Sequence, residues 1–193
     1  YSSTVEIENN WLPSIRLGGE IDVAFYKLRL DLRRFAMEAT RQDPASFEKL
    51  KSVRAQALEV AERYAPLVSS PEEQAKYNEA LSGIKNYIQK TDEFLAQASS
   101  LSAEQAATYL REVNGPIALD VQRAIGELIA LNARGSAEAV QVASSEYQGA
   151  RLFTWILMVG SLLVAVVVAR LFARSIIKPV HELLVSTGKI ADG

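Results

Sequence analysis

The chain has 193 residues, of which 49% are hydrophobic, 23% are charged and none is Cys, and this composition excludes a disordered chain and a disulfide scaffold. Its net charge of −2 gives no reason to expect nucleic acid as a partner. A single His without Cys disfavours a zinc cluster, a thiol nucleophile and a Ser/His/Asp triad. Since no compact set of acid, base and nucleophile emerges either, we expect no catalytic residues, no metal, no cofactor and no enzymatic activity.

Residues 1–150 have the pattern of four amphipathic helices joined by short connections. Apolar residues recur at spacings of three and four along each helix, which indicates one buried face per helix. The four predicted faces are Ile21, Phe25, Leu28, Leu32, Phe35 and Ala39; Leu50, Val53, Ala57, Val60, Tyr64 and Leu67; Tyr77, Leu81, Ile84, Ile88, Thr91 and Leu95; and Leu110, Val113, Ile117, Ala124, Leu128 and Leu131. Because the connections are short, neighbouring helices must run antiparallel, and the predicted fold class is all-α, an up-down-up-down four-helix bundle.

The helix starts carry N-capping signals. Asp43 followed by Pro44 is an N-cap residue with Pro at the first helical position, so we expect the first helix to end near Arg41. The next two starts have the spacing of a capping box, at Ser70–Glu73 and at Ser102–Gln105. These signals divide the region into its four helices.

The strongest signal lies at residues 152–169 (LFTWILMVGSLLVAVVVA), which carry no charge and are bracketed by Arg151 and Arg170. A bilayer core of about 30 Å needs roughly 20 helical residues, so we predict a transmembrane helix over residues 151–173. After Pro116 the next proline is Pro179, so the fourth helix of the bundle is expected to continue into this membrane helix.

Orientation follows from the charges that flank the span. Arg170, Arg174 and Lys178 follow it, whereas only Arg151 lies close before it, which places residues 174–193 in the cytoplasm. Residues 1–150 then face the periplasm or the cell exterior. Because the chain opens at Tyr1 with no Met and no export signal, we expect a first membrane helix to precede it.

The segment after the span carries a specific motif. Residues 177–183 (IKPVHEL), followed by residues 190–193 (IADG), look like the first helix of a HAMP domain: Pro179, Glu182 three residues later, an apolar heptad seam and the final Gly193 all match. HAMP domains are parallel dimeric signal converters, so the resemblance implies a homodimer in the membrane.

A four-helix bundle, a membrane helix and a HAMP start together resemble the bacterial methyl-accepting chemotaxis proteins with a four-helix-bundle sensor domain. Residues 10–15 (NWLPSI) also look like the opening of such sensors. The resemblance implies a transmembrane chemoreceptor that signals to a chemotaxis kinase and its adaptor. Two other interpretations stay open: the input module of a sensor histidine kinase or diguanylate cyclase, and a bundle that senses a protein partner.

Basic residues gather in the second half of the first helix. Arg29 and Arg33 are four residues apart on one face, and each directly follows a residue of the apolar face. Counted from the end of the bundle, Arg33 lies at about the same height as Arg111, with Tyr109 and Asn114 nearby. Guanidiniums, a phenol and an amide could hold a small carboxylate, because Arg offers paired donors that match two carboxylate oxygens. The alternative is that these arginines are solvated and ion-paired.

The family resemblance favours the ligand site. In aspartate-type chemoreceptors, arginines of the first helix and a Tyr…Thr stretch of the fourth helix form a site across the dimer interface. Arg29 and Arg33 match the arginine spacing, and Asn114 stands where the family has Thr, which disfavours aspartate itself. We therefore expect a small organic carboxylate or an amino acid as ligand. The candidate ligand-binding residues are Arg29, Arg33, Arg34, Tyr109, Arg111 and Asn114.

Overall fold

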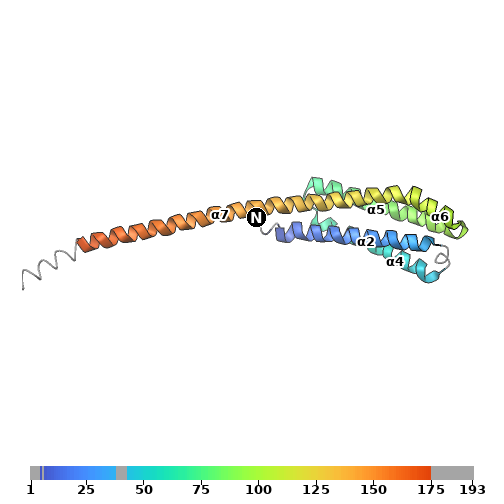
Figure 1. Ribbon diagram of the computed structural model, residues 1–193, viewed down its shortest axis with the longest axis horizontal. Helices are drawn as coiled ribbons and strands as arrows, with labels where there is room; N and C mark the ends of the chain where they lie inside the picture. The colour runs from blue at the N-terminus through green and yellow to red at the C-terminus, as the bar shows by residue number, and fades with distance from the viewer. Residues whose placement is uncertain (1–4, 6, 38–42, 175–193) are drawn as a thin grey trace, which may run out of the picture. The chain divides into compact units, whose positions relative to one another are not determined.

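The computed structural model describes residues 5, 7–37 and 43–174, which contain helices and turns and no strand (Figure 1). The elements in chain order are η1 (Ile7–Trp11), α2 (Leu12–Ala36), α4 (Pro44–Glu62), η2 (Ala65–Leu67), α5 (Pro71–Gln97), η3 (Ala98–Ser100), α6 (Ala103–Tyr109), η4 (Leu110–Asn114) and α7 (Gly115–Phe172). The elements η1 and η4 are π-helical turns, and η2 and η3 are 3₁₀ turns. The predicted all-α up-down-up-down bundle is confirmed, with α6, η4 and α7 as its fourth helical segment.

The chain divides into two compact units, Tyr1–Val142 and Ala143–Gly193. Helix α7 contributes to both, so the boundary that we predicted at residue 150 lies within it. The helical run Ala103–Phe172 contains an 18-residue window with a mean hydropathy of 2.6 and no buried residue, so it is long and apolar enough to cross a membrane. The HAMP-like residues 177–193 lie outside the described residues.

The apolar face of the first helix is confirmed, since Ile21, Phe25, Leu28, Leu32 and Phe35 are all buried, while Ala39 lies outside the described residues. The predicted end of this helix near Arg41 is wrong. Helix α2 ends at Ala36, because the backbone at Met37 is extended (φ −66°, ψ 135°) and its N–H bonds to the Arg34 carbonyl, which tightens the last turn.

The capping predictions are confirmed at two of the three later starts. Asp43 accepts hydrogen bonds from the N–H groups of Ala45 (3.0 Å) and Ser46 (3.3 Å). Ser102 and Gln105 form the complete capping box. At the start of α5 only half of the box exists: Ser70 accepts from the Glu73 N–H at 3.1 Å, but the Glu73 side chain does not return to Ser70.

Glu73 turns inward and joins a buried polar chain. The Tyr64 hydroxyl donates to Glu73 Oε1 at 2.7 Å, and the Ser69 N–H and hydroxyl donate to Oε2 at 2.8 and 3.0 Å. Asn132 Nδ2 of α7 donates to the Tyr64 oxygen at 2.7 Å. The partners come from three parts of the bundle, and they explain why a carboxylate that is 1% exposed is tolerated there. We call Tyr64, Ser69, Glu73 and Asn132 the polar network.

The second helix buries the predicted residues Leu50, Ala57, Val60 and Tyr64, and Val53 and Leu67 are half-buried against the core. On α5 the predicted core residues Tyr77, Ile84 and Thr91 are buried, but the other three core positions lie one residue earlier than we predicted. Its core residues are Glu73, Tyr77, Ala80, Ile84, Tyr87, Thr91 and Phe94.

Leu81, Ile88 and Leu95, which we predicted in the core, are only half-buried at its edge. The reason is aromatic packing: Tyr87 meets Phe25 edge-on, with ring centroids 5.0 Å apart, and Phe94 packs on Tyr109 at 5.5 Å. Two rings fill more core volume than the aliphatic residues one position later.

Helix α7 approaches its neighbours closely at two glycines. A Cβ added at Gly18 of α2 would lie 2.7 Å from Ile129 Cγ1, and one added at Gly83 of α5 would lie 2.8 Å from Val121 Cγ2. Larger side chains at these positions would force the helices apart, so both glycines set the helix spacing around α7.

Candidate functional site

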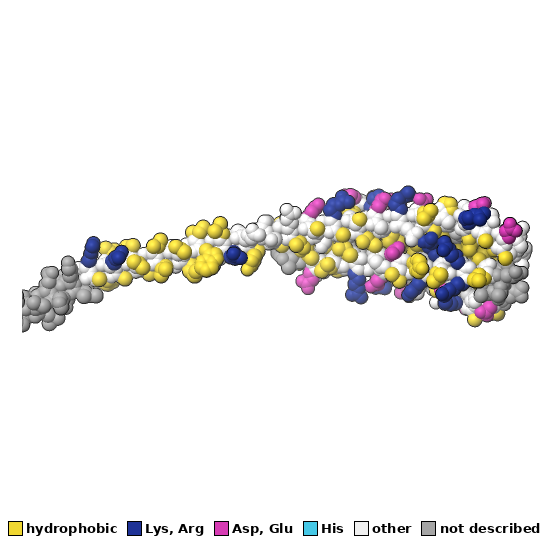
Figure 2. Space-filling model, in the orientation of Figure 1, with side chains coloured by type: hydrophobic (Ala, Val, Ile, Leu, Met, Phe, Trp, Pro, Cys, Tyr) yellow, Lys and Arg dark blue, Asp and Glu magenta, His cyan; other side chains and the backbone are white. Residues whose placement is uncertain are grey.

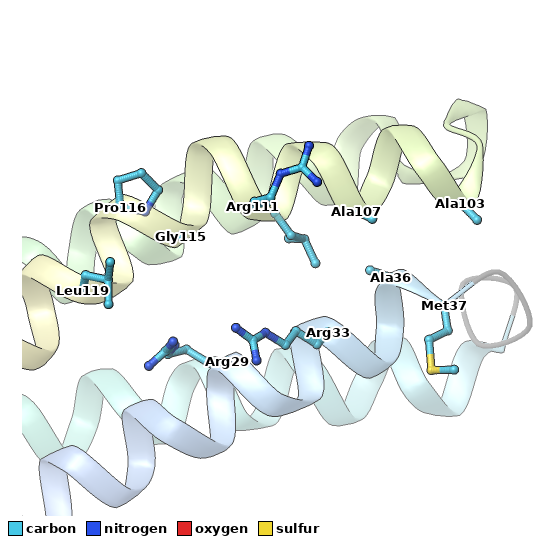
Figure 3. A pocket seen from close by; sticks show the side chains of 11 residues that line it. Arg29, Arg33, Ala36, Met37, Ala103, Ala107, Arg111, Gly115, Pro116 and Leu119 are labelled. Atoms are coloured by element: carbon cyan, nitrogen blue, oxygen red, sulfur yellow. The ribbon is translucent and has the colours of Figure 1, made fainter.

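An open groove of about 660 Å³ lies between the end of α2 and the fourth helical segment (Figure 3). Among the described residues, its lining contains three arginines and no acidic residue, and the remaining side chains are apolar. The lining residues are Arg29, Arg33, Ala36, Met37, Ala103, Ala107, Leu110, Arg111, Gly115, Pro116 and Leu119. Figure 2 shows basic side chains interspersed with hydrophobic ones on the face where α2 and α6 lie. A groove of this composition suits an anion with an apolar body.

Arg29 and Arg33 project from α2 toward the fourth segment, one helical turn apart (Figure 3). Arg29 is half-buried, with its guanidinium carbon 5.9 Å from the centroid of the Phe25 ring, and Arg33 is exposed. Among the described residues neither arginine forms an ion pair. Two positive charges without a carboxylate partner therefore face the groove.

The π-helical turn η4 shapes the opposite wall. Pro116 has no N–H to donate to the carbonyl of Glu112, and its ring crowds that carbonyl in a regular α-helix, so the backbone widens here. Core contacts then recur every four residues, at Ala106, Leu110, Asn114 and Ala118, instead of every 3.6.

The widened turn corrects our prediction for the fourth helix. Val113 and Ile117, which we placed on the core face, are half-buried, and Asn114 takes the core position at 2% exposure. Leu110 and Leu131 are likewise half-buried, while Ala124 and Leu128 are buried as predicted. The extra residue in the turn rotates the helix by most of one position and brings a polar side chain into the core.

A small cavity of about 20 Å³ lies behind the groove. It shares Arg29, Arg33, Leu110 and Gly115 with the groove and extends to Tyr87 and Asn114 in the core. Burial raises the pKa of Tyr87 to about 12, although the positive charges of Arg29 and Arg33 and the amide of Asn114 act in the opposite direction. The Tyr87 phenol is therefore neutral at physiological pH, and it interacts electrostatically with the guanidiniums of Arg29 and Arg33.

Within the described part of the chain, the Asn114 side chain uses one of its two N–H donors and leaves its oxygen without a donor. Its Nδ2 donates to Thr91 Oγ1 at 3.4 Å, and its buried Oδ1 has no partner among the described residues. The Thr91 hydroxyl donates to the Tyr87 carbonyl at 2.9 Å, so its oxygen remains free to accept. This arrangement fixes which end of the amide faces Thr91 and leaves the acceptor oxygen unsatisfied.

The structure brings four of the six predicted site residues together: Arg29, Arg33 and Arg111 line the groove, and Asn114 lines the cavity behind it. The guanidinium of Arg111 bonds to Glu112 at 3.3 Å. The other two candidates lie elsewhere.

Arg34 pairs with Asp31 at 3.3 Å and lines neither space. Tyr109 packs on Phe94 of α5, and its hydroxyl donates to the Lys90 carbonyl at 3.4 Å. Because Tyr109 lies one residue before the widened turn, it points to a different side of the helix from the core residues that follow.

Sequence reasoning missed Tyr87. It belongs to α5, which carried no predicted site residue, and it was taken neither as core nor as ligand contact. The available signal was the run of polar residues at core spacing on that helix, Tyr87 followed by Thr91. Within residues 7–37 and 43–174 no group of three or more His, Cys, Asp and Glu could hold a metal ion.

Comparisons with known proteins agree with this fold. Residues 2–147 match the family of four-helix-bundle sensory modules for signal transduction. A relative from Bacillus subtilis (strain 168), which carries the name sensory transducer protein YvaQ, is 19% identical over 98% of this chain. The chain spans 34% of the length of that relative. Among solved structures, the periplasmic sensor domain of a sensor histidine kinase aligns with a TM-score of 0.63 and 17% identity, over 72% of this chain and 94% of that one.

The structural match shows the shared bundle fold, and the family match extends over most of the chain, including every helix that lines the groove. The protein thus belongs to the family of four-helix-bundle sensory modules for signal transduction.

Proposed function

We propose that this chain is the sensor part of a transmembrane chemoreceptor of the methyl-accepting type, which binds a small organic acid or amino acid in the periplasm. The observation that carries the proposal is the pair Arg29 and Arg33, one turn apart and without ion-pair partners among the described residues, in an apolar groove that contains no carboxylate. The apolar segment of α7 would anchor the protein in a bacterial inner membrane.

The groove suits a carboxylate for two reasons. Arginine presents donors in a planar fork that matches two carboxylate oxygens, and such charge-assisted bonds are stronger than neutral ones. The apolar remainder of the lining, from Ala36 and Met37 on one side to Pro116 and Leu119 on the other, can cover the body of the ligand. The positive charge of the groove therefore favours anions over cations, and the volume of the groove limits the size of the ligand.

We propose that the sensor works as a homodimer. Helix α2 carries a second apolar stripe outside the core, in which Val23, Tyr26 and Met37 are 53%, 58% and 64% exposed. They are 3 and 11 residues apart, so they share one side of the helix, which suits packing against another helix. Leu119 of α7 is 65% exposed and lines the groove, so a second copy that packs there could complete the site.

Signal transmission would run through α7, which lines the groove at Gly115 and continues to Phe172. A ligand that prefers one packing of the bundle shifts the population of that packing, and a coupling of about 1–3 kcal/mol is typical of such systems. The shift would bias the HAMP-like segment, which lies outside the described residues.

The displacement can be measured with engineered cysteines, because the chain has none of its own. Single cysteines at residues 136–150 would be oxidised in membranes with and without ligand. We expect crosslinking rates to change at some positions on ligand addition. Identical rates at every position would overturn the displacement mechanism.

Ligand binding is tested by calorimetry on the whole chain in lipid nanodiscs, with propionate, lactate, succinate, malate, benzoate, 4-hydroxybenzoate, alanine and aspartate as probes. We expect at least one carboxylate to bind and Arg29→Ala or Arg33→Ala to weaken it at least tenfold. Arg123→Ala, which removes an exposed arginine of α7 that pairs with Asp120, is the matched control and should leave binding unchanged. No binding, or binding indifferent to Arg29 and Arg33, would contradict the proposal.

The output of the whole protein decides between a chemoreceptor, which would act on a chemotaxis kinase through an adaptor, and a sensor kinase or cyclase. The name of the Bacillus subtilis relative supports the first. Sequencing the gene downstream of residue 193 tests it: a long helical hairpin with Glu and Gln methylation sites is expected. A catalytic domain there would overturn the chemoreceptor assignment while leaving the ligand site intact.

A further inference from the structure

We propose that Asn114 and Tyr87 recognise a hydroxyl group of the ligand, so that the preferred ligands are hydroxy acids rather than unsubstituted acids or amino acids. The inference rests on the proposed function, because it assumes a carboxylate bound by Arg29 and Arg33. It assigns a ligand contact to Tyr87, a residue of the third bundle helix, and a chemical class to the ligand.

The first argument is the orientation of the Asn114 amide. The hydroxyl hydrogen of Thr91 is used by the Tyr87 carbonyl, so Thr91 can only accept from Asn114, and Nδ2 must face it. The other end of the amide, Oδ1, is a buried acceptor without a partner in the described part of the chain. A buried acceptor left unpaired is unfavourable, and because Asn114 lines the cavity behind the groove, a donor supplied by a ligand would compensate it.

The second argument is the size of the cavity. Its volume of about 20 Å³ is enough for one water molecule or one hydroxyl group, and too small for a carboxylate. The cavity adjoins the groove at Arg29 and Arg33, so a carboxylate held by these arginines would place a neighbouring substituent at its mouth.

The third argument concerns the alternative donor, an ammonium group. An ammonium ion favours a carboxylate or several acceptors, and the described residues that line the groove and the cavity include no acidic side chain and offer the side-chain oxygens of Tyr87 and Asn114 alone. It would also lie beside the two guanidiniums, whose charge repels it. A hydroxyl donates one hydrogen bond to Asn114 Oδ1, accepts one from the neutral Tyr87 phenol, and carries no charge.

The test compares matched acids on the unaltered chain in nanodiscs at pH 7. The pairs are lactate against propionate and malate against succinate, in which the hydroxyl group neighbours a carboxylate, with alanine and aspartate as the amino counterparts. For the pair that fits the groove we expect the hydroxy acid to bind at least tenfold more tightly than both its unsubstituted and its amino counterpart. This measurement requires no substitution, so it does not depend on the folding of a variant.

Two variants then assign the preference to residues. Asn114→Leu and Tyr87→Phe should each reduce the ratio between the two dissociation constants to below about threefold, whereas Asn86→Leu, an exposed asparagine of α5, should leave the ratio unchanged. Circular dichroism and melting curves show whether each variant keeps the bundle.

The outcomes separate the two proposals. Equal affinities within a pair, or tighter binding of the amino acid, would overturn the hydroxyl proposal, and loss of that binding in Arg33→Ala would leave the proposed function standing. A hydroxyl preference that survives both variants would also overturn the assignment to Asn114 and Tyr87. If no carboxylate binds, both proposals fall together.

Discussion

The two ends of the bundle each bury an asparagine of the fourth helical segment beside a tyrosine, but the two pairs have different surroundings. In the polar network, Asn132 donates to Tyr64 at 2.7 Å, and Tyr64 passes the chain on to the carboxylate of Glu73, also at 2.7 Å. At the groove, Asn114 reaches only Thr91, at 3.4 Å, and its oxygen faces no partner among the described residues.

The comparison teaches how one fold uses the same residue types for two purposes. The connected set stabilises the packing of three helices, since the Glu73 carboxylate and the Tyr64 hydroxyl are each compensated by a neighbour, although the buried Asn132 Oδ1 has no partner in the described part of the chain. The less connected set lies beside a cavity and two guanidiniums without ion-pair partners among the described residues, so its unused hydrogen-bonding groups can serve a ligand. The following experiments test whether the two pairs contribute differently to folding stability, and they are ordered from the largest expected effect to the smallest.

The largest effect is expected for Tyr64→Phe. The substitution removes the donor to the buried Glu73 carboxylate and the acceptor of Asn132, so we expect the free energy of unfolding to fall by about 2–3 kcal/mol. Chemical denaturation followed by circular dichroism measures it. Tyr147→Phe, at a tyrosine that is 69% exposed, is the control, and equal effects of the two substitutions would show that the network contributes nothing.

High pH should destabilise both ends through their tyrosines. Burial is the main cause that raises the pKa of Tyr64 and also that of Tyr87, in the latter case to about 12. Above pH 10 the unfolded chain releases these protons while the folded chain keeps them, so the free energy of unfolding falls as the pH rises.

The slope contributed by each tyrosine approaches about 1.4 kcal/mol per pH unit between the two pKa values. Denaturation curves from pH 8 to 11 should therefore be less steep in pH for Tyr64→Phe and Tyr87→Phe than for the unaltered chain. If neither variant changes the slope, the two phenols are not the groups that keep their protons in the folded state.

The two asparagines allow a direct comparison through one kind of substitution. Asn132→Leu should cost about 1–2 kcal/mol, because it deprives Tyr64 of a donor at 2.7 Å. Asn114→Leu should cost less than about 1 kcal/mol, since it removes one long hydrogen bond together with an unpaired acceptor. Melting and denaturation curves of the two variants measure both losses in the free energy of unfolding. A larger loss for Asn114→Leu than for Asn132→Leu would contradict the expected difference between the two ends.

The smallest effect on stability is expected for Arg33→Ala. The side chain is exposed and has no ion-pair partner in the described residues, so the free energy of unfolding should change by less than about 0.5 kcal/mol. Ligand binding, by contrast, should weaken at least tenfold. A large loss of stability in this variant would show that Arg33 stabilises the bundle and would contradict its assignment to ligand binding alone.

Local sequence signals account for the elements of the fold. Asp43 and Ser102 cap their helices as predicted, because the capping hydrogen bonds join residues two and three positions apart. The buried face of α2 follows from spacing, since Ile21, Phe25, Leu28, Leu32 and Phe35 recur at intervals of three and four residues. The pair Arg29 and Arg33 was found in the same way.

Features that depend on two or more helices could not be read in this way. The choice between Ile88 and Tyr87 depends on where Phe25 lies on another helix, because the two rings pack together. Likewise, Glu73 leaves its expected cap because Tyr64 and Ser69 offer it hydrogen bonds from outside its own helix.

The sequence by itself thus determined four helices, three of them with N-capping residues, an apolar segment long enough to cross a membrane, and two arginines on one helical face. Only the tertiary structure decided which side of each later helix turns inward, that the widened turn before Pro116 buries Asn114, and that Tyr87 joins the site. The physical reason is that period and capping are properties of neighbouring residues, whereas the rotation of a helix about its axis is set by the side chains of the helices against which it packs.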